Sequence, residues 1–160
     1  MKNLILYASK NHTTEETVLR IKAHADHPLD IHKISEAGNL DLSGYSHIYI
    51  GTGIYGGKLP GSVTGYVKKN KERLRTKPVT FFIHGLDSKE SYSRIVNQGV
   101  SRYLENKHYE TLYLGGKLDI SSQNFFIRMI LVEIAKKNHF DPHMADTRRE
   151  DAILALIKRF

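Results

Sequence analysis

The sequence predicts an α/β protein with a doubly wound, five-stranded parallel sheet in the order 2-1-3-4-5, and two observations predict it. Apolar runs of strand length alternate with segments at helical spacing, which is typical of parallel strands joined by helices on both faces of a sheet. The second run is polar and only partly alternating, which suits an edge strand. With 160 residues, 40% of them apolar, the chain is expected to form a single domain, 1–160.

The individual elements follow from these runs. Strands are expected at 4–8, 29–34, 47–51, 79–84 and 111–115, and helices at 14–25, 62–74, 92–104 and 149–160. The last helix has the clearest apolar stripe, at i, i+3, i+4 and i+7, which consists of Ile153, Leu156, Ile157 and Phe160. Thr147 and Glu150 are expected to form a capping box at its start.

Composition excludes several kinds of site. The chain has no cysteine, so disulfides, thiolate catalysis and cysteine-based zinc sites are excluded. The first strand begins too early to follow a signal peptide, and no apolar run reaches the length of a membrane span, so we expect a cytoplasmic protein. The net charge of +7 predicts attraction to an anionic partner: nucleic acid, an acidic membrane leaflet or a substrate with several carboxylates. The basic run at 68–77 is expected to be a solvated helix face.

The segment after the first strand, 9–14, has two interpretations. Its hydroxyl and amide side chains follow a buried strand and open a helix, where unpaired N–H groups and the helix dipole favour an anion. Thr13 and Glu16 also fit a capping box, which needs no ligand. Neither the P-loop lysine pattern nor G-x-G-x-x-G is present, which disfavours nucleoside triphosphates and NAD.

The segment after the third strand, 51–61, contains five glycines and Tyr55. Glycine lets the backbone approach a flat ligand, and Tyr55 offers a ring face for stacking. The alternative is a glycine-rich turn whose tyrosine packs over its own loop. Ligands of a doubly wound sheet bind beyond the carboxyl ends of strands 1, 3 and 4, so we expect the function in the three loops 9–14, 52–61 and 85–92.

These loops resemble those of flavodoxin-like FMN proteins. The phosphate loop of that family has the pattern S/T-x-T-G-x-T, and the corresponding residues here are Ser9-Lys10-Asn11-His12-Thr13-Thr14. Tyr55-Gly56 resembles the aromatic–glycine pair that stacks on the isoalloxazine ring. The resemblance implies FMN as the cofactor and the following contact residues: Ser9, Lys10, Asn11, His12, Thr13, Thr14, Thr52, Gly53, Ile54, Tyr55, Gly56, Gly57, Gly85, Leu86, Asp87 and Tyr92.

Within this set the implied roles differ. Ser9, Asn11 and Thr14 would hold the phosphate, Leu86 would border the ring edge, and Tyr92 would be a second stacking partner or part of a buried stripe. His12 departs from the family, which has glycine there. Since a positive φ angle strains a non-glycine residue, either the loop differs or His12 adopts the strained conformation. In compensation, His12 and Lys10 could each supply positive charge to the phosphate dianion.

The resemblance narrows to the menaquinone-dependent protoporphyrinogen oxidase type and its flavodoxin-domain relatives. It is carried by 1–7, by the phosphate loop onward through 66–69, by 115–118 and by 146–149. It implies an oxidoreductase that passes electrons from a reduced substrate, such as the anionic protoporphyrinogen, to a quinone-type acceptor. Because the flavin itself accepts hydride or single electrons, no catalytic side chain is expected.

A helical insert, about 117–146, follows the fifth strand and is absent from an ordinary short flavodoxin. Over 125–135 only Arg128 and Glu133 are polar, so the helix is apolar nearly all round and must be covered. One alternative is that the helix is buried against the domain or against a second subunit of a homodimer. The other is that 124–137 forms an apolar wall beside the flavin or rests on the inner face of the membrane. The basic pairs 136–137 and 148–149 would suit anionic headgroups or substrate carboxylates.

Three functions compete: a flavin oxidoreductase working with a quinone or porphyrinogen, a soluble electron carrier between redox proteins, and a basic domain that no longer binds FMN. Flavodoxin carriers, as the family is known, are generally acidic, so the basic charge and the apolar insert favour the first, with no nucleic-acid partner expected. A metal site is disfavoured because the histidine pairs 24/27 and 139/143 lack further ligands at a fixed spacing. A Ser-His-Asp hydrolase is disfavoured because G-x-S-x-G is absent.

Overall fold

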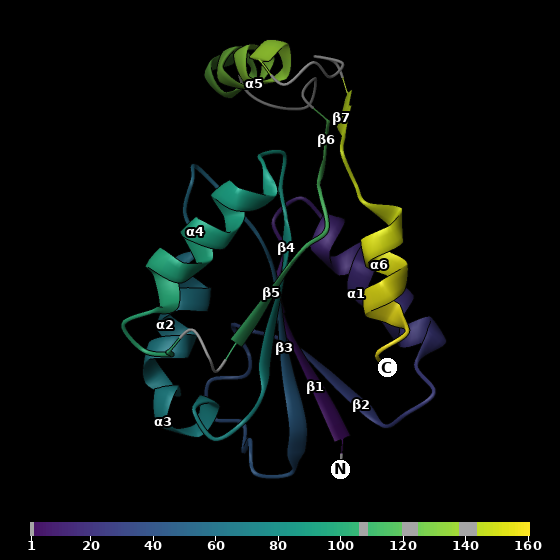
Figure 1. The fold of residues 1–160 in the computed structure, drawn as a ribbon, viewed down its shortest axis with the longest axis vertical. Coiled ribbons are helices and arrows are strands. Elements are labelled where there is room, and N and C mark those ends of the chain that lie inside the picture. The colour runs from purple at the N-terminus through teal and green to yellow at the C-terminus, as the bar shows by residue number, and fades with distance from the viewer. Residues whose placement is uncertain (1, 106–108, 120–124, 138–143) are drawn as a thin grey trace.

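The structure is a computed structural model that describes residues 2–105, 109–119, 125–137 and 144–160. Its centre is a parallel sheet with the predicted order β2-β1-β3-β4-β5 (Figure 1). The strands are β1 (Lys2–Ala8), β2 (Leu29–Lys33), β3 (Tyr45–Gly53), β4 (Val79–His84) and β5 (Tyr109–Tyr113). As expected of an edge strand, β2 has no fully buried residue.

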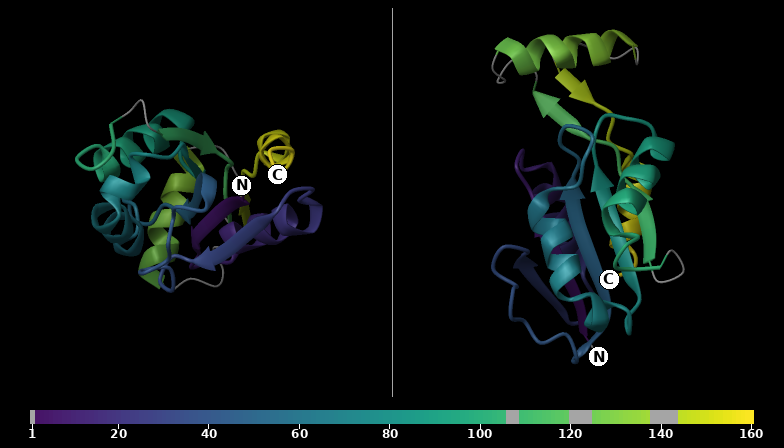
Figure 2. Two further views of the ribbon diagram at one scale, coloured as in Figure 1. Left: turned by 90° about the horizontal axis from the view of Figure 1, so that it is seen from below. Right: turned by 90° about the vertical axis from the view of Figure 1, so that its left-hand side faces the viewer.

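Helices cover both faces of the sheet, as Figures 1 and 2 show. One face carries α2 (Gly61–Lys69), α3 (Lys71–Leu74) and α4 (Lys89–Val100), and the other carries α1 (Thr13–His24) and α6 (Glu150–Ile157). Successive strand residues point to opposite faces, so Leu4 and Leu6 join one apolar cluster while Ile5 and Tyr7 join the other. Both faces of the sheet are therefore buried.

Two expected helices differ most from the observed ones, while the last, 149–160, is shorter and spans Glu150–Ile157. The segment 62–74 is interrupted at Asn70, whose side-chain amide donates to the carbonyl of Tyr66 at 3.1 Å and so competes with the helical backbone pattern. The expected helix 92–104 begins at Lys89, because the hydroxyl of Ser88 accepts the backbone N–H of Ser91 and caps it.

Neither the expected capping box of Thr147 and Glu150 nor the alternative one of Thr13 and Glu16 forms. His12 is the N-cap residue of α1 and Arg149 that of α6, and neither makes a side-chain cap bond. Thr13 lies inside α1 and its hydroxyl donates to the carbonyl of Lys117, whereas the hydroxyl of Thr147 accepts the backbone N–H of Gly116. Both threonines therefore hold the chain that leaves β5 rather than a helix start.

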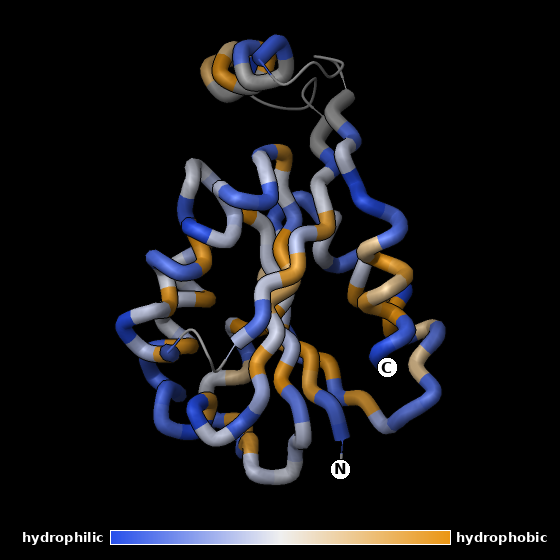
Figure 3. Tube along the Cα trace, viewed as in Figure 1, coloured by the Kyte–Doolittle hydropathy of each residue, from blue (hydrophilic) through white to orange (hydrophobic). Residues whose placement is uncertain are grey.

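The insert rises from the carboxyl edge of the sheet. Strands β6 (Lys117–Asp119) and β7 (Met144–Asp146) form an antiparallel ribbon that carries α5 (Phe125–Lys137) above the body of the molecule (Figures 1 and 2). Four large apolar side chains of α5 are more than half exposed: Phe125, Phe126, Met129 and Ile130. Figure 3 shows the apolar colouring of α5 apart from that of the core strands. Burial against the domain is thus wrong for these four side chains. No helix in the described ranges combines the length and apolar character that crossing a membrane requires.

The cations of the basic run at 68–75 are exposed, as expected of a solvated helix face, and three cations of 73–77 also bond to neighbouring loops. The ammonium of Lys77 donates to the carbonyls of Ser43 and Tyr45, at 3.0 and 2.7 Å, and Arg73 donates to the carbonyl of Leu40. Arg75 donates to the carbonyl of Tyr103 at 2.9 Å. Arg73 and Arg75 therefore join neighbouring loops to the end of α3, and Lys77 holds the start of β3.

Candidate functional site

A cavity of about 630 Å³ opens at the carboxyl edge of the sheet, where the loops after β1, β3 and β4 meet. Its size falls in the range of small-molecule sites. Thirteen of the predicted site residues line it: Lys10, Asn11, Thr13, Thr14, Gly53, Ile54, Tyr55, Gly56, Gly57, Gly85, Leu86, Asp87 and Tyr92. The three loops predicted to carry the function are thus brought together.

Ser9, His12 and Thr52 are not among the lining residues. Thr52 is fully buried, and its hydroxyl donates to the carbonyl of Gly53 at 3.1 Å. The hydroxyl of Ser9 is buried and has no hydrogen-bond partner in the structure. Because a buried polar group without a partner is costly, Ser9 is a position where a ligand would supply a missing bond.

The backbone at His12 decides between the two expectations for this residue. Its φ angle is 59° and its ψ angle −16°, a left-handed conformation, and among the described non-glycine residues it is the one with positive φ. The strained alternative is therefore the right one. The imidazole Nδ1 lies 3.0 Å from the Glu15 carboxylate, and hydrogen bonds from His12 and Tyr7 lower the pKa of Glu15. His12 thus pairs with Glu15 outside the cavity lining.

Tyr55 is held by a tight hairpin. Its backbone N–H and carbonyl pair with those of Lys58, and the two residues between them, Gly56 and Gly57, have φ angles of 56° and 71°. Two consecutive positive φ angles identify a type I′ turn, for which glycine is suited. A Cβ atom on Gly53 would lie 2.8 Å from the Tyr55 oxygen, so Gly53 makes room for the ring. Tyr55 therefore both packs over its own loop and lines the cavity.

His84, at the end of β4, is a lining residue that the sequence-based prediction missed. It is buried, with Nδ1 at 2.8 Å from the carbonyl oxygen of Gly115 and Nε2 at 3.0 Å from the Thr17 hydroxyl. Since a carbonyl only accepts, we assign the proton to Nδ1, which leaves Nε2 to accept from Thr17. Burial lowers the pKa of His84 to about 4, so the ring is neutral at pH 7. The sequence signal that could have identified it is a polar residue, His84, at the end of a central apolar strand.

Tyr92 supports the third loop, 85–92, through its hydroxyl group and its ring. Its hydroxyl oxygen accepts the backbone N–H of Asp87 at 2.7 Å, and its ring stacks on Tyr113 at 5.0 Å between centroids. Burial raises the pKa of Tyr92 above its ordinary value. A Cβ atom on Gly85 would lie 2.1 Å from the Tyr92 oxygen, so this loop requires glycine there. Tyr92 is only 3% exposed, so its side chain belongs mostly to the buried stripe, which was the alternative interpretation.

The insert completes the wall of the cavity. Further lining residues outside the predicted contact set are Ile95, Gly116, Lys117, Ile130 and Lys137. The last two belong to α5, so the segment 124–137, for which a wall beside the cofactor was one alternative, does reach the cavity. The root of the insert is fixed at Gly115, where φ is 67° and a Cβ atom would lie 1.8 Å from the backbone oxygen of Thr147. The carbonyl of Gly115 also accepts the N–H of Gly85 at 3.2 Å. The insert is therefore built onto the same loops that form the site.

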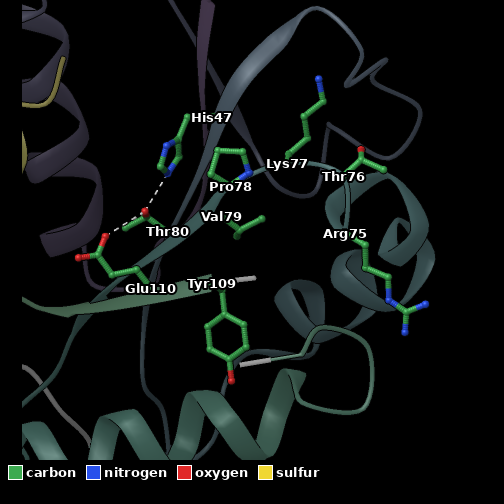
Figure 4. Close-up of a pocket in the computed structure, with 9 residues that line it drawn as sticks. All are labelled: His47, Arg75, Thr76, Lys77, Pro78, Val79, Thr80, Tyr109 and Glu110. Carbon is green, nitrogen blue, oxygen red and sulfur yellow. Dashed lines mark hydrogen bonds between the residues drawn. The ribbon is translucent and has the colours of Figure 1, made fainter. Parts of the chain in front are cut away.

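A second hollow, of about 560 Å³, lies at the amino edge of the sheet (Figure 4). His47, Thr80 and Glu110 form a row in which His47 Nε2 lies 2.8 Å from the Thr80 hydroxyl. Glu110 is paired with Arg159, and Figure 4 shows Arg75 and Lys77 pointing away from this row. Its polar groups therefore do not converge on one point. In the described parts of the chain, no three potential metal-ligating side chains lie together, and His139 and His143 are outside those parts.

Residues 4–145 match the family model described as a flavodoxin domain. The chain belongs to the flavodoxin domain family. None of the curated proteins matches it significantly. The family assignment confirms the flavodoxin-like resemblance, and the narrower protoporphyrinogen oxidase type stays a prediction.

Solved structures agree with the flavodoxin fold. The oxidised flavodoxin 2 of Bacillus cereus has 22% sequence identity and a TM-score of 0.53, with 86% of this chain and 99% of that chain covered. The Megasphaera elsdenii flavodoxin, in its two-electron reduced form, has 19% identity and a TM-score of 0.57, with 71% and 84% covered. A Lactobacillus acidophilus flavoprotein in complex with FMN has 18% identity and a TM-score of 0.52, with 72% and 92% covered. At these identities the likeness concerns the fold.

The charged residues that line the cavity of this flavodoxin-domain protein are Lys10, Lys117, Lys137 and Asp87. The cavity lining thus carries three ammonium groups and one carboxylate, and the buried His84 is neutral. Lys10 and the start of α1 lie at one end, and Lys137 comes from α5. The arrangement favours ligands with negative charge.

Proposed function

We propose that this protein binds FMN in the cavity and works as a flavin oxidoreductase. The observation that carries the proposal is the buried, unpartnered hydroxyl of Ser9 in a loop that opens α1. A phosphate oxygen would accept a hydrogen bond from this hydroxyl and from backbone N–H groups at the helix start, where the dipole favours an anion. The left-handed backbone at His12 gives the loop the conformation that a glycine would otherwise provide.

The remaining lining residues suit the rest of the cofactor. Asn11 and Thr14 would join Ser9 at the phosphate, and Tyr55 offers an aromatic face to the ring. Gly85 and Leu86 would border the ring edge. Bound FMN supplies hydride and single-electron transfer. The protein's own side chains would bind and orient it. His84, neutral and hydrogen-bonded at both nitrogens, fixes the end of β4 at the cavity wall.

The reaction we propose is oxidation of a reduced substrate, with protoporphyrinogen as the candidate, coupled to reduction of a quinone. Electrons and protons removed from the substrate pass to the quinone, which becomes a quinol on gaining two of each. Support comes from the net charge of +7 and from the lysines of the cavity, which suit a substrate with carboxylates. The exposed apolar residues of α5 suit an apolar acceptor.

The membrane is the partner we propose for the exposed face of α5. Phe125, Phe126 and Met129 are exposed beside the basic side chains Arg128 and Lys136. Apolar residues next to cations suit the interface of an anionic leaflet, which would bring a lipid-soluble quinone close to the site.

The functional test combines binding and turnover. FMN titration should quench flavin fluorescence, and porphyrinogen oxidation should accelerate when a menaquinone analogue is added. Deleting 125–137 should abolish quinone-coupled oxidation and leave FMN binding intact. If FMN binds but the quinone has no effect, while a redox protein accepts the electrons, the soluble electron carrier is the correct function.

A further inference from the structure

Helix α5 presents two different sides to two different hollows. Ile130 and Lys137 both line the main cavity. They are seven residues apart, and at about 100° per residue they lie on the same side of the helix. Met129 and Lys136, their neighbours in sequence, line a separate hollow together with Phe125, Arg128, Val132 and Glu133. One side of α5 therefore belongs to the cavity and the other does not.

The α5 side of the cavity is chemically distinct from the part assigned to FMN. The phosphate and ring positions rest on the loops after β1, β3 and β4, none of which includes α5. Ile130 is 60% exposed and offers an apolar surface, while Lys137 offers an ammonium group. None of the ion pairs in the described part of the chain involves Lys137. An apolar surface and an available cation thus face the same space.

We propose that this end of the cavity is a second binding site, for a small anionic molecule with an apolar body. Lys137 binds the anionic group and Ile130 contacts the apolar part. The inference deepens the proposed function, on which it rests for the occupant of the other end of the cavity. It gives the substrate class as an amphiphilic anion and assigns its recognition to two residues of the insert.

The two residues favour an amphiphilic anion over simpler ligands, because a simpler ligand would use only one of the two contacts. A neutral apolar ligand would contact Ile130 but form no ion pair with the exposed Lys137 ammonium. A small inorganic anion would leave Ile130 exposed to water and forgo its apolar contact. Lys117, at the base of the ribbon, adds further positive charge to the same cavity.

The test uses two naphthalene probes that differ in one charged group. The anionic 8-anilinonaphthalene-1-sulfonate and its neutral counterpart N-phenyl-1-naphthylamine are titrated into the FMN-loaded protein and followed by fluorescence. Lys137→Glu should weaken binding of the anionic probe about tenfold, which corresponds to about 1.4 kcal/mol, and change binding of the neutral probe less than about twofold. Lys136→Glu is the matched control, because it changes the net charge equally but lies on the other side of α5. Equal weakening by both substitutions, or by neither, overturns the proposal.

A second pair of substitutions tests the apolar contact made by Ile130. Ile130→Asn should weaken both probes, whereas Met129→Asn, at a nearly equal exposure of 58% against 60%, should leave both within about twofold of the unchanged protein. Equal effects of the two substitutions would place probe binding on α5 in general and contradict the proposal. If the protein binds no FMN, the proposed function fails, and the same four variants measured in the flavin-free protein still decide whether this site exists.

Discussion

The phenolic oxygen of Tyr55 accepts a hydrogen bond from the backbone N–H of Lys10 at 2.9 Å. This bond joins the loop after β3 to the loop after β1, and the ammonium of Lys10 lies 5.9 Å from the centre of the same ring. The residue proposed to stack on the flavin is therefore positioned by the loop proposed to hold its phosphate. Tyr55 would therefore couple phosphate binding to ring binding.

Two substitutions at Tyr55 separate its ring from its hydroxyl. Tyr55→Phe keeps the ring and loses the bond to Lys10, so FMN affinity should stay within about threefold and the free energy of unfolding should fall by about 1 kcal/mol or less. Tyr55→Ala removes the aromatic face and should weaken FMN binding at least about tenfold. Fluorescence titration measures both. Equal affinities of the two variants would show that the ring does not contact the flavin.

Substitutions of His12 test the strain in the phosphate loop. His12→Gly should be more stable than His12→Ala by about 1 kcal/mol, because both lose the contact with Glu15 but only alanine keeps a Cβ atom at positive φ. Urea unfolding measures the difference. FMN affinity of His12→Gly should match that of the unchanged protein, since the imidazole does not line the cavity. A large loss of affinity would instead show that His12 contacts the phosphate.

His84 should make stability depend on pH in the acid range. Its folded-state pKa of about 4 lies below the ordinary histidine value of 6.5, so between these values the unfolded chain binds more protons. Its contribution to stability is full above pH 6.5 and is lost as the pH falls towards 4, by about 3 kcal/mol at most. His84→Asn, which does not titrate, should lose less stability over this interval in urea unfolding. Parallel pH profiles of the two proteins would contradict the prediction.

Gly115 should be required at the root of the insert. Gly115→Ala places a Cβ atom 1.8 Å from the Thr147 oxygen at a residue with positive φ, and we expect a loss of more than about 2 kcal/mol in the free energy of unfolding. Gly65→Ala is the control, because no atom lies within 4 Å of its added Cβ in the middle of α2. That variant should gain about 0.5 kcal/mol or more. Similar effects of both substitutions would contradict this account of the insert.

Membrane contact by α5 should depend on its exposed aromatic residues. The paired substitution of Phe125 and Phe126 by serine should abolish co-sedimentation with vesicles that contain anionic phospholipid, because it removes the most exposed apolar surface of α5. Leu19→Ser on α1, which is 59% exposed, is the control and should leave binding unchanged. Binding that survives the loss of both phenylalanines would contradict the proposal.

The sheet order and the three loops could be predicted from the sequence, because strand-length apolar runs and the residues that follow them are local patterns. The strand 79–84 matches β4 at both ends, and thirteen of sixteen predicted site residues line one cavity. The family match agrees with the FMN prediction that came from the same loops.

What could not be predicted depends on contacts between distant segments. The threonines of the two supposed capping boxes bond to the chain that leaves β5 instead, which no local pattern indicates. Likewise, His84 becomes a site residue only because Thr17 and Gly115 lie beside it. An apolar wall from 124–137 was one alternative, but that Ile130 and Lys137 are the residues that line the cavity follows from the ribbon that carries α5 over the site.

The most direct test of the central claim is titration of the purified protein with FMN, comparing the unchanged protein with Ser9→Ala. The account predicts quenching of flavin fluorescence with saturation at one FMN per chain. It also predicts weaker binding by Ser9→Ala, because the buried hydroxyl at that position would no longer meet the phosphate. A protein that is colourless when purified and leaves flavin fluorescence unchanged at micromolar FMN would contradict it.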